Sequence, residues 1–462
     1  MSKRTLLVAP CSLFVAALSL SLGACDAADG DAADAAESHV VTADLTLAGG
    51  AIDRLGAEFH VLDAASLDLS TAMSAEEARQ RVAGVDAVGI DLGKLDRADV
   101  TAFKALSQAA MEEDVPVIVE DVAAEELAQL IGVGVEADVA VITSLGPNSY
   151  RVLVFGGGEG GAVASAEGEG DELLESPDDD ETPTAAWSPD TVSLAVERIG
   201  ETLRSGAVTR LEAAPRASLA PTSGYLYYDF DMAEESWSPV TGQTASLSMD
   251  FEAELALDSD RAQKALLLRP TGSGQHPGTL ISDGSTDRGY YQESQKVSLA
   301  PNNTNVSLYA HAPATANAST TYTSSTGYTI GSEGGWPLIG YSVSDETTTT
   351  LSDFSMVNNT SGSTASWTFS MTSSWSSMYS QAAFEKCKVK SLPALAKSNL
   401  NPEYEVYYRA SDSFTSSVTF SFAKQTLFRR ISRGGDIFTC KKYSSLWTVD
   451  RSRNVSIDFG AV

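Results

Sequence analysis

Residues 320–350 read TTYTSSTGYTIGSEGGWPLIGYSVSDETTTT. Two runs alternate between larger apolar residues and Thr or Ser, and a Gly-rich segment separates them. Each run has the roughly 10 residues that a tilted strand needs to cross a bilayer. The stretch therefore predicts a hairpin of membrane length. Its alternating apolar positions are Tyr322, Tyr328, Ile330, Tyr341 and Val343.

The chemistry of lipid limits how such a hairpin could be used. A lone hairpin leaves edge N–H and C=O groups unsatisfied, which hydrocarbon does not tolerate. A ring of hairpins, one per subunit, closes the ladder into a barrel with a polar lumen. At the turn, Trp336, Leu338 and Ile339 are suited to leading insertion, because Trp favours membrane interfaces. Periodicity alone leaves a second interpretation open, a Ser/Thr-rich surface hairpin of a β-sandwich.

Composition excludes several classes of function. The 462 residues include 62 acidic and 31 basic side chains, for a net charge of −31, and only four His. Such a charge disfavours nucleic-acid binding, and so few His disfavour a His-ligated metal centre or His-based catalysis. Residues 26–220 hold 39 acidic and 11 basic side chains (net −28), whereas residues 221–462 hold 23 and 18 (net −5). The chain thus has two chemically different halves.

The N-terminus predicts export. Residues 1–24 have a basic start, a short apolar run and small residues at the end, as in a signal peptide, and Leu-Gly-Ala-Cys25 resembles a lipobox with a lipidated Cys25. An ordinary signal peptide ending at a Cys is the alternative. Residues 25–39 form an Ala/Asp/Gly tether.

In an oxidising compartment the remaining Cys387 and Cys440 are expected to form a disulfide, and their spacing does not suit zinc.

The pattern further along predicts three regions. Residues 40–162 alternate helix-like and strand-like segments and predict an α/β domain, with a capping box at Ser74 to Glu77. Residues 163–222 predict an acidic linker with one helix, where Arg204, Arg210 and Arg216 are exposed to proteolysis. Residues 223–462 alternate as half-buried antiparallel strands and predict a β-sandwich or barrel. No nucleophile accompanies His60 and Asp63, so we expect no enzyme, cofactor or metal site.

The order of motifs after the hairpin resembles the leukocidin/alpha-hemolysin family of β-barrel pore-forming toxins, including the Vibrio-type cytolysins. The likeness extends from about Tyr225 to Phe459. It rests on short segments at residues 353–357, 365–369, 401–406, 418–422 and 447–457. The motif residues with an expected structural role are Asp353, Phe354, Trp367, Asn401, Pro402, Glu403 and Tyr404. The α/β half more weakly resembles the pro-region of those cytolysins; an unrelated α/β binding domain is the alternative.

The resemblance implies a monomer that binds target-membrane lipids or a surface receptor, self-associates into a ring, typically a heptamer, and inserts one hairpin per subunit after removal of the N-terminal region. It implies a leukocidin-like sandwich with a rim, where Trp375 and Tyr379 are membrane-binding candidates; a core position for Trp375 is the alternative. No basic residue is clearly placed for a phosphocholine pocket. The expected location is the bacterial envelope through the lipid anchor, or the exterior after release, and then the target membrane. The rival function is a non-lytic surface lipoprotein that binds a glycan or protein.

Overall fold

The computed structural model describes the residues from Gly50 onward with several gaps, and for β16, β17 and a few other positions it describes only the backbone. The described ranges are 50–64, 67, 73–94, 100–168, 191–204, 224–233, 235–240, 243–258, 261–272, 274–282, 284–312, 321–333, 336–350, 354–380, 388–397, 400–402, 404–434 and 441–462. Seven of the predicted residues lie outside them: Cys25, Arg210, Arg216, Asp353, Cys387, Glu403 and Cys440.

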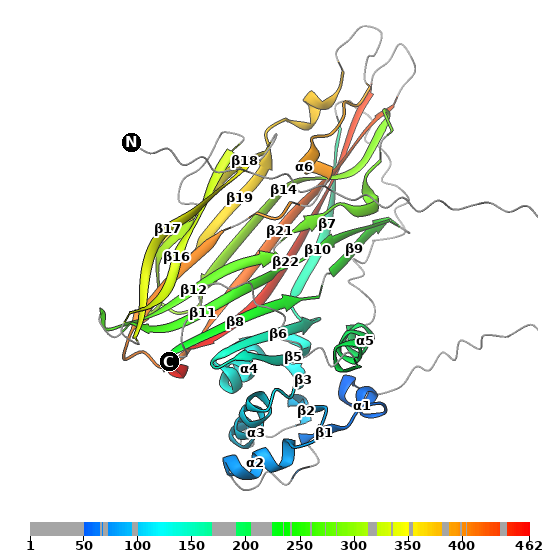
Figure 1. Ribbon diagram of the computed structural model, residues 1–462. Helices are drawn as coiled ribbons and strands as arrows, with labels where there is room; N and C mark the ends of the chain where they lie inside the picture. Colours follow the sequence, from blue (N-terminus) through cyan, green and yellow to red (C-terminus); the bar gives the residue numbers. More distant parts are fainter. Residues whose placement is uncertain are drawn as a thin grey trace, which may run out of the picture. The chain divides into compact units, whose positions relative to one another are not determined.

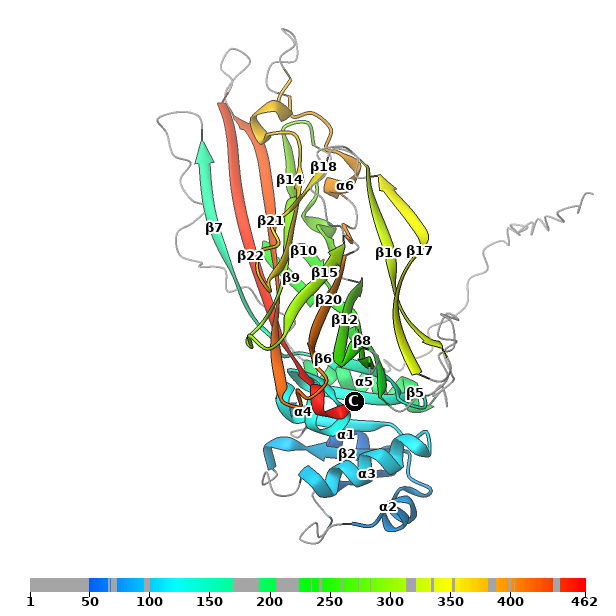
Figure 2. The ribbon, with the colours of Figure 1, turned by 90° about the vertical axis from the view of Figure 1, so that its left-hand side faces the viewer.

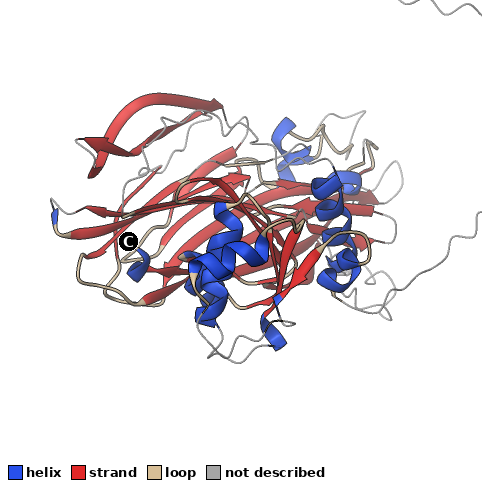
Figure 3. Ribbon diagram, turned by 60° about the horizontal axis from the view of Figure 1, so that its bottom comes forward, coloured by secondary structure: helices blue, strands red, loops and turns tan. Residues whose placement is uncertain are grey.

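β-Structure dominates, as predicted, and helices are few (Figure 3). The α-helices are α1 (Ala51–Gly56), α2 (Ala75–Val82), α3 (Val100–Glu112), α4 (Ala124–Ile131), α5 (Thr191–Arg204) and α6 (Ala394–Lys397). The short 3-10 helices are η2 (Leu92–Lys94), η4 (Gly278–Leu280), η5 (Trp375–Met378) and η6 (Phe459–Ala461). The predicted capping box is confirmed, because the Ser74 hydroxyl accepts from the Glu77 backbone N–H at 3.2 Å.

Two large sheets and one separate hairpin contain most of the strands (Figure 1). A ten-stranded sheet has the order β1 (Val61–Asp63), β2 (Ala87–Asp91), β3 (Val117–Val122), β5 (Ala137–Gly146), β6 (Ser149–Phe155), β8 (Tyr225–Met232), β11 (Asp250–Asp258), β12 (Gln263–Gly272), β20 (Glu405–Ser411) and β15 (Ser307–Ala312). β1, β2 and β3 are parallel, and the buried run Ala87–Ile90 suits a strand covered on both faces.

The second large sheet lies across the core from the antiparallel part of the first. Its order is β18 (Phe354–Asn358), β19 (Ala365–Met371), β14 (Asp287–Pro301), β21 (Ser417–Gly434), β22 (Lys441–Asp458) and β4 (Val133–Val135), with β7 (Glu159–Gly168) also paired to β22. A three-stranded sheet has the order β13 (Gln275–His276), β10 (Gln243–Leu247) and β9 (Glu235–Val240).

Both large sheets combine strands from the two halves of the sequence. β6 pairs in parallel with β8, and β4 and β7 pair antiparallel with β22, the last strand of the chain. β7 runs across the boundary predicted at residue 162. The region predicted as α/β therefore contributes strands to the same hydrogen-bonded ladders as the β-rich region.

Buried aromatic side chains fill the space between the two large sheets. Phe230 stacks on Phe251 with ring centroids 4.7 Å apart, and Phe251 meets Phe422 of the opposite sheet edge to face at 6.0 Å. The same cluster continues into the apolar faces of α3 and α4. Since burying one large apolar side chain contributes about 1.5–3 kcal/mol, this shared core couples the two sheets strongly.

β16 (Thr321–Glu333) and β17 (Trp336–Thr350) form the hairpin predicted from the sequence. Among the described strands they pair only with each other. Figure 2 shows them as a separate layer beside β8 and β12, on the side away from β21 and β22. Within the described residues, no helix has the length and apolar character needed to span a membrane.

Candidate functional site

The register of the hairpin sets which of its predicted residues lie opposite each other. Tyr328 pairs with Tyr341, and Ile330 pairs with Ile339. The register shifts between Thr326, which pairs with Asp345, and Tyr328, which pairs with Tyr341. One residue of β16 therefore lies opposite three residues of β17 at this point. With 13 and 15 residues, both strands exceed the length that a tilted membrane strand requires.

A buried charged cluster occupies the face of the ten-stranded sheet that points away from the core. Arg269 contacts Glu252 at 3.0 Å, Glu254 at 3.2 Å and Glu405 at 2.8 Å. Burial raises the pKa of Glu254, and the nearby Arg269 opposes this shift. Tyr225 donates its hydroxyl to Glu254 at 3.2 Å. Since β17 lies against β11 on this side of the sheet, the cluster belongs to the layer on which the hairpin rests.

The two predicted rim residues lie at the opposite end of the long strands from the C-terminus. Tyr379 is fully buried, and its hydroxyl donates to the carbonyl oxygens of Ser432 at 2.7 Å and Tyr443 at 3.0 Å. Trp375 is half-buried, and its ring lies edge to face with Tyr379 at 6.3 Å. Tyr379 thus ties its own segment to β21 and β22, while part of Trp375 stays accessible.

The described motif residues lie mainly inside the sandwich. Phe354 and Trp367 are fully buried and Tyr404 nearly so, with the rings of Trp367 and Tyr404 5.0 Å apart. Pro402 is buried and Asn401 is exposed at the start of the motif's turn. Burial also lowers the pKa of His311, whose ring lies 5.9 Å from Trp367. The contact between Trp367 on β19 and Tyr404, next to β20, joins the two large sheets.

Arg204, a predicted processing site, ends α5 and forms an exposed ion pair with Glu58 at 2.7 Å. Its hydrogen bond lowers the pKa of Glu58. His60 contacts the Gly84 carbonyl oxygen through Nδ1 at 3.1 Å and lies at the edge of the sheet. Within the part of the chain that the structure describes, no group of three or more His, Cys, Asp or Glu residues is placed to hold a metal ion.

Sequence reasoning missed an ion cluster in the β-rich half, to which a glycine turn of the N-terminal half is hydrogen-bonded. Glu235 on β9 accepts from Arg451 and Arg453 on β22, and these two guanidinium groups also donate to carbonyl oxygens of Gly156, Gly157 and Gly158. All three glycines have positive φ, so their turn presents its carbonyls to the arginines. The spacing of Arg451 and Arg453, two apart on a strand, was the available signal, because it places both on one face.

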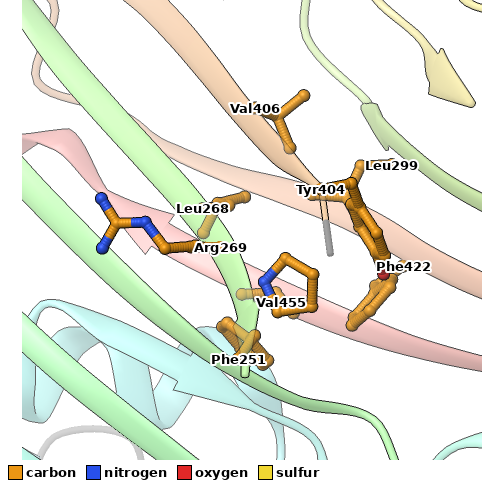
Figure 4. A pocket seen from close by; sticks show the side chains of 9 residues that line it. Phe251, Leu268, Arg269, Leu299, Tyr404, Val406, Phe422 and Val455 are labelled. Atoms are coloured by element: carbon orange, nitrogen blue, oxygen red, sulfur yellow. The ribbon is translucent and has the colours of Figure 1, made fainter. Parts of the chain in front are cut away.

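A small cavity lies between the two large sheets (Figure 4). Its lining surface is apolar, and the guanidinium group of Arg269 points away from it, towards Glu252, Glu254 and Glu405. The lining residues are Phe251, Leu268, Arg269, Pro270, Leu299, Tyr404, Val406, Phe422 and Val455. Because it lies inside the sandwich core and its lining carries no side chains arranged for catalysis, we interpret it as a gap in the packing.

Comparisons with known proteins found similarity to several solved structures at a low level. No sequence profile of a known protein family matches it, and no curated protein matches it. Similar solved structures include a chain described as "Pore forming protein" (TM-score 0.34, 13% identity, 49% of this chain and 94% of that chain). Others are Clostridium perfringens delta-toxin (0.34, 12%, 49% and 90%) and the Clostridium perfringens NetB toxin in the membrane inserted form (0.29, 15%, 51% and 96%). TM-scores this low carry no argument about function.

Proposed function

We propose that this chain is a pore-forming toxin that binds a target membrane, self-associates into a ring and inserts the β16–β17 hairpin of each subunit. The hairpin carries the proposal. It forms its own two-stranded sheet, both strands reach membrane length, and the sequence alternates larger apolar residues with Thr and Ser. The order of motifs from residue 353 to residue 457 adds the family resemblance.

Insertion requires that the hairpin leave its layer without unfolding the sandwich. Since the described strands of the two large sheets do not pair with β16 or β17, the hairpin can leave while the ladders of those sheets stay intact. In lipid its edges are satisfied only by neighbouring hairpins. Ring assembly therefore has to accompany insertion, and a heptamer is the subunit number that the resemblance implies.

The N-terminal region keeps the precursor monomeric in this proposal. Its strands β4 and β7 cover the edge of β22, and an open strand edge is a ready template for pairing with another chain. Cleavage near Arg204, Arg210 or Arg216 would begin activation. Cys25 would anchor the exported protein through lipid, and Cys387 with Cys440 would form a disulfide.

Dye release from liposomes tests the pore directly. The purified mature protein, intact and after limited trypsin treatment, should release an encapsulated dye and yield a detergent-resistant ring in electron micrographs in at least one of the two states. The absence of leakage and of rings in both states would refute the proposal and favour the non-lytic lipoprotein.

The lipid anchor has its own test. Cys25→Ser should abolish incorporation of labelled lipid, and unchanged labelling would refute the anchor.

A further inference from the structure

We propose that β15 of one copy of this chain pairs with β8 of the next copy in the ring, at the edge where β6 of the N-terminal region pairs within a single copy. The inference deepens the proposed function and rests on it, because it names the two surfaces through which the copies associate. By this inference, the N-terminal region keeps the precursor monomeric because β6 occupies the place of a neighbouring copy.

The two ends of the antiparallel part of the ten-stranded sheet differ in how they are covered. This part has the order β8, β11, β12, β20 and β15. At one end, β8 pairs with β6. At the other end, β15 pairs only with β20 among the described strands, so no described strand covers its outer edge. An open strand edge is a template for pairing with another chain.

A closed ring needs two different surfaces on each copy, one of which fits the other on the next copy. β8 and β15 lie at opposite ends of the same antiparallel array, so one can follow the other from copy to copy. Their lengths also agree. β15 has six residues and β8 has eight, and β6 pairs with β8 through six residues, from Ser149 to Val154. β15 is therefore long enough to replace β6.

The strand directions agree as well. Every step from β8 through β11, β12 and β20 to β15 is antiparallel, so β8 and β15 run in the same direction within one copy. Neighbours in a heptamer are related by a rotation of about 51°, which turns no strand by more than that angle. β15 of one copy would therefore run roughly parallel to β8 of the next. β6 pairs with β8 in this same parallel sense.

An acidic side chain marks the edge of β8. Asp229 lies directly opposite Arg151 of β6, and the Arg151 guanidinium donates to its carboxylate through Nε at 3.0 Å and through Nη2 at 2.6 Å. Both side chains are largely shielded from solvent. Because a shielded carboxylate is costly to leave without a partner, a strand that replaces β6 should bring a cation with it.

The open edge carries such a cation, Arg409. Its Nε donates to the Tyr407 hydroxyl at 3.1 Å, and its guanidinium lies over the ring of Tyr309 on β15, 3.0 Å from the ring centroid. Neither of these partners is a carboxylate. Arg409 thus carries its positive charge from β20 out to the edge strand, where Asp229 of the next copy can meet it.

Arg409 and Asp229 lie on the same face of the sheet. The register places Arg409 opposite Ala265, and Ala265 opposite Ala256. Ala256 lies opposite Tyr225, which is four residues before Asp229 on β8. Since alternate residues of a strand share a face, Tyr225 and Asp229 point the same way. Pairing of β15 with β8 of the next copy therefore brings the cation and the carboxylate to one face of a continuous sheet.

Tyr309 gives the open edge an exposed aromatic side chain. It is 57% exposed, whereas Leu308 beside it packs against the core. Leu308 pairs with Tyr408, and Ala310 pairs with Tyr407, so Tyr309 is the additional residue of a β-bulge. Tyr and Arg are enriched among the residues that dominate binding energy at protein interfaces. The open edge thus has the side chains of an interface between copies.

Charge reversal tests the contact between copies. The mature protein is treated with trypsin and added to phosphatidylcholine liposomes, and rings are counted in electron micrographs. Arg409→Glu and Asp229→Arg should each lower the yield of rings more than about tenfold, because like charges at an interface strongly oppose association. The double variant Arg409→Glu/Asp229→Arg restores opposite charges and should recover the rings. The control Lys296→Glu makes the same reversal at an exposed site on β14, inside the other large sheet, and should assemble as wild type.

A reversible lock tests whether β6 has to leave. Ser149 and Tyr227 lie opposite each other on β6 and β8, so Ser149→Cys/Tyr227→Cys places two thiols across this pair of strands. A non-reducing gel of the trypsin-treated variant shows whether the disulfide has formed. The oxidised variant should form no rings, and reduction should restore them, with the wild type under the same reducing conditions as control. Equal ring yields before and after reduction of a confirmed disulfide would overturn the inference.

The outcomes separate this inference from the pore itself. Wild-type rings that persist equally in both single charge variants would overturn the inference and leave the pore standing. A double variant that fails to recover rings would also count against it. Neither rings nor leakage from the wild type would refute the pore and this inference together. Thermal melting and co-sedimentation with the liposomes show that each variant is folded and still binds.

Discussion

Arg451 donates from Nε and Nη2 to the two carboxylate oxygens of Glu235, at 2.5 Å each, so that strand β22 is held to β9 by a bidentate pair. Arg453 donates to the same carboxylate at 2.7 Å. Burial lowers the pKa of Arg453, and the Glu235 charge opposes this shift. One carboxylate thus compensates two buried guanidinium groups that also hold the Gly156–Gly158 turn.

Glu235→Gln should destabilise the protein strongly. It removes the carboxylate that pairs with two buried guanidinium groups, and breaking a buried ion pair from one side typically costs about 3–5 kcal/mol. Urea unfolding of the two proteins measures the difference. Glu58→Gln, which removes the exposed partner of Arg204, is the matched control and should change little. A loss for Glu235→Gln no larger than for this control would contradict the buried-pair account.

Cleavage between α5 and β8 should not by itself release the N-terminal piece. β6 remains paired with β8, and β4 and β7 remain paired with β22. After a limited trypsin cut near Arg210 or Arg216, the two fragments should elute together in gel filtration and separate only in denaturant. Separate elution in plain buffer would show that these strand pairs are too weak to hold the pieces together.

A charge on the lipid-facing side of the inserted hairpin should block the pore. Tyr328 lies near the middle of the predicted span, where Lys on the lipid face costs about 2–4 kcal/mol per subunit. Tyr328→Lys should therefore abolish dye release while vesicle binding persists. Thr329→Lys places the same charge on the alternate face, towards the lumen, and should retain leakage. Equal leakage from both variants would rule out this assignment of faces.

Trp375 and Tyr379 should differ in what their replacement changes. Tyr379→Phe removes the donor shared by the Ser432 and Tyr443 carbonyls, which should lower stability by about 0.5–1.5 kcal/mol with little effect on vesicle binding. Trp375→Ala should weaken vesicle binding more than it lowers the melting temperature. If Trp375→Ala mainly lowered stability and Tyr379→Phe mainly weakened vesicle binding, Trp375 would be a core residue and Tyr379 the membrane contact.

Lys424 should make stability depend on pH. Burial lowers its pKa from 10.5 to about 7, against the opposing effect of Glu235 and Asp250. Between these values the unfolded chain binds one more proton than the folded one, so the free energy of unfolding should rise with pH from about 7 towards 10.5. Denaturant titrations at several pH values should show a smaller rise for Lys424→Met. Equal slopes would contradict the assignment to Lys424.

Local structure follows from residue patterns that can be recognised without the fold. The alternation at residues 320–350 predicted the hairpin, and Ser74 with Glu77 predicted the start of α2. Side-chain periodicity and capping act over a few residues, so a single chain segment contains this information. The order of aromatic motifs indicated the β-rich region, where Phe354, Trp367 and Tyr404 are buried together.

The contacts between distant segments depend on the tertiary fold. The pairing of β7 with β22, the contacts of Glu235 with Arg451 and Arg453, and the hydrogen bond from Tyr379 to Ser432 all join residues more than 50 positions apart. Backbone hydrogen bonds between strands carry little sequence specificity, and net charge along a chain does not reveal which charges share a surface. Long-range strand pairing therefore set both the cover on β22 and the ion pairs of Glu235, because a local sequence pattern does not identify the distant partner in either case.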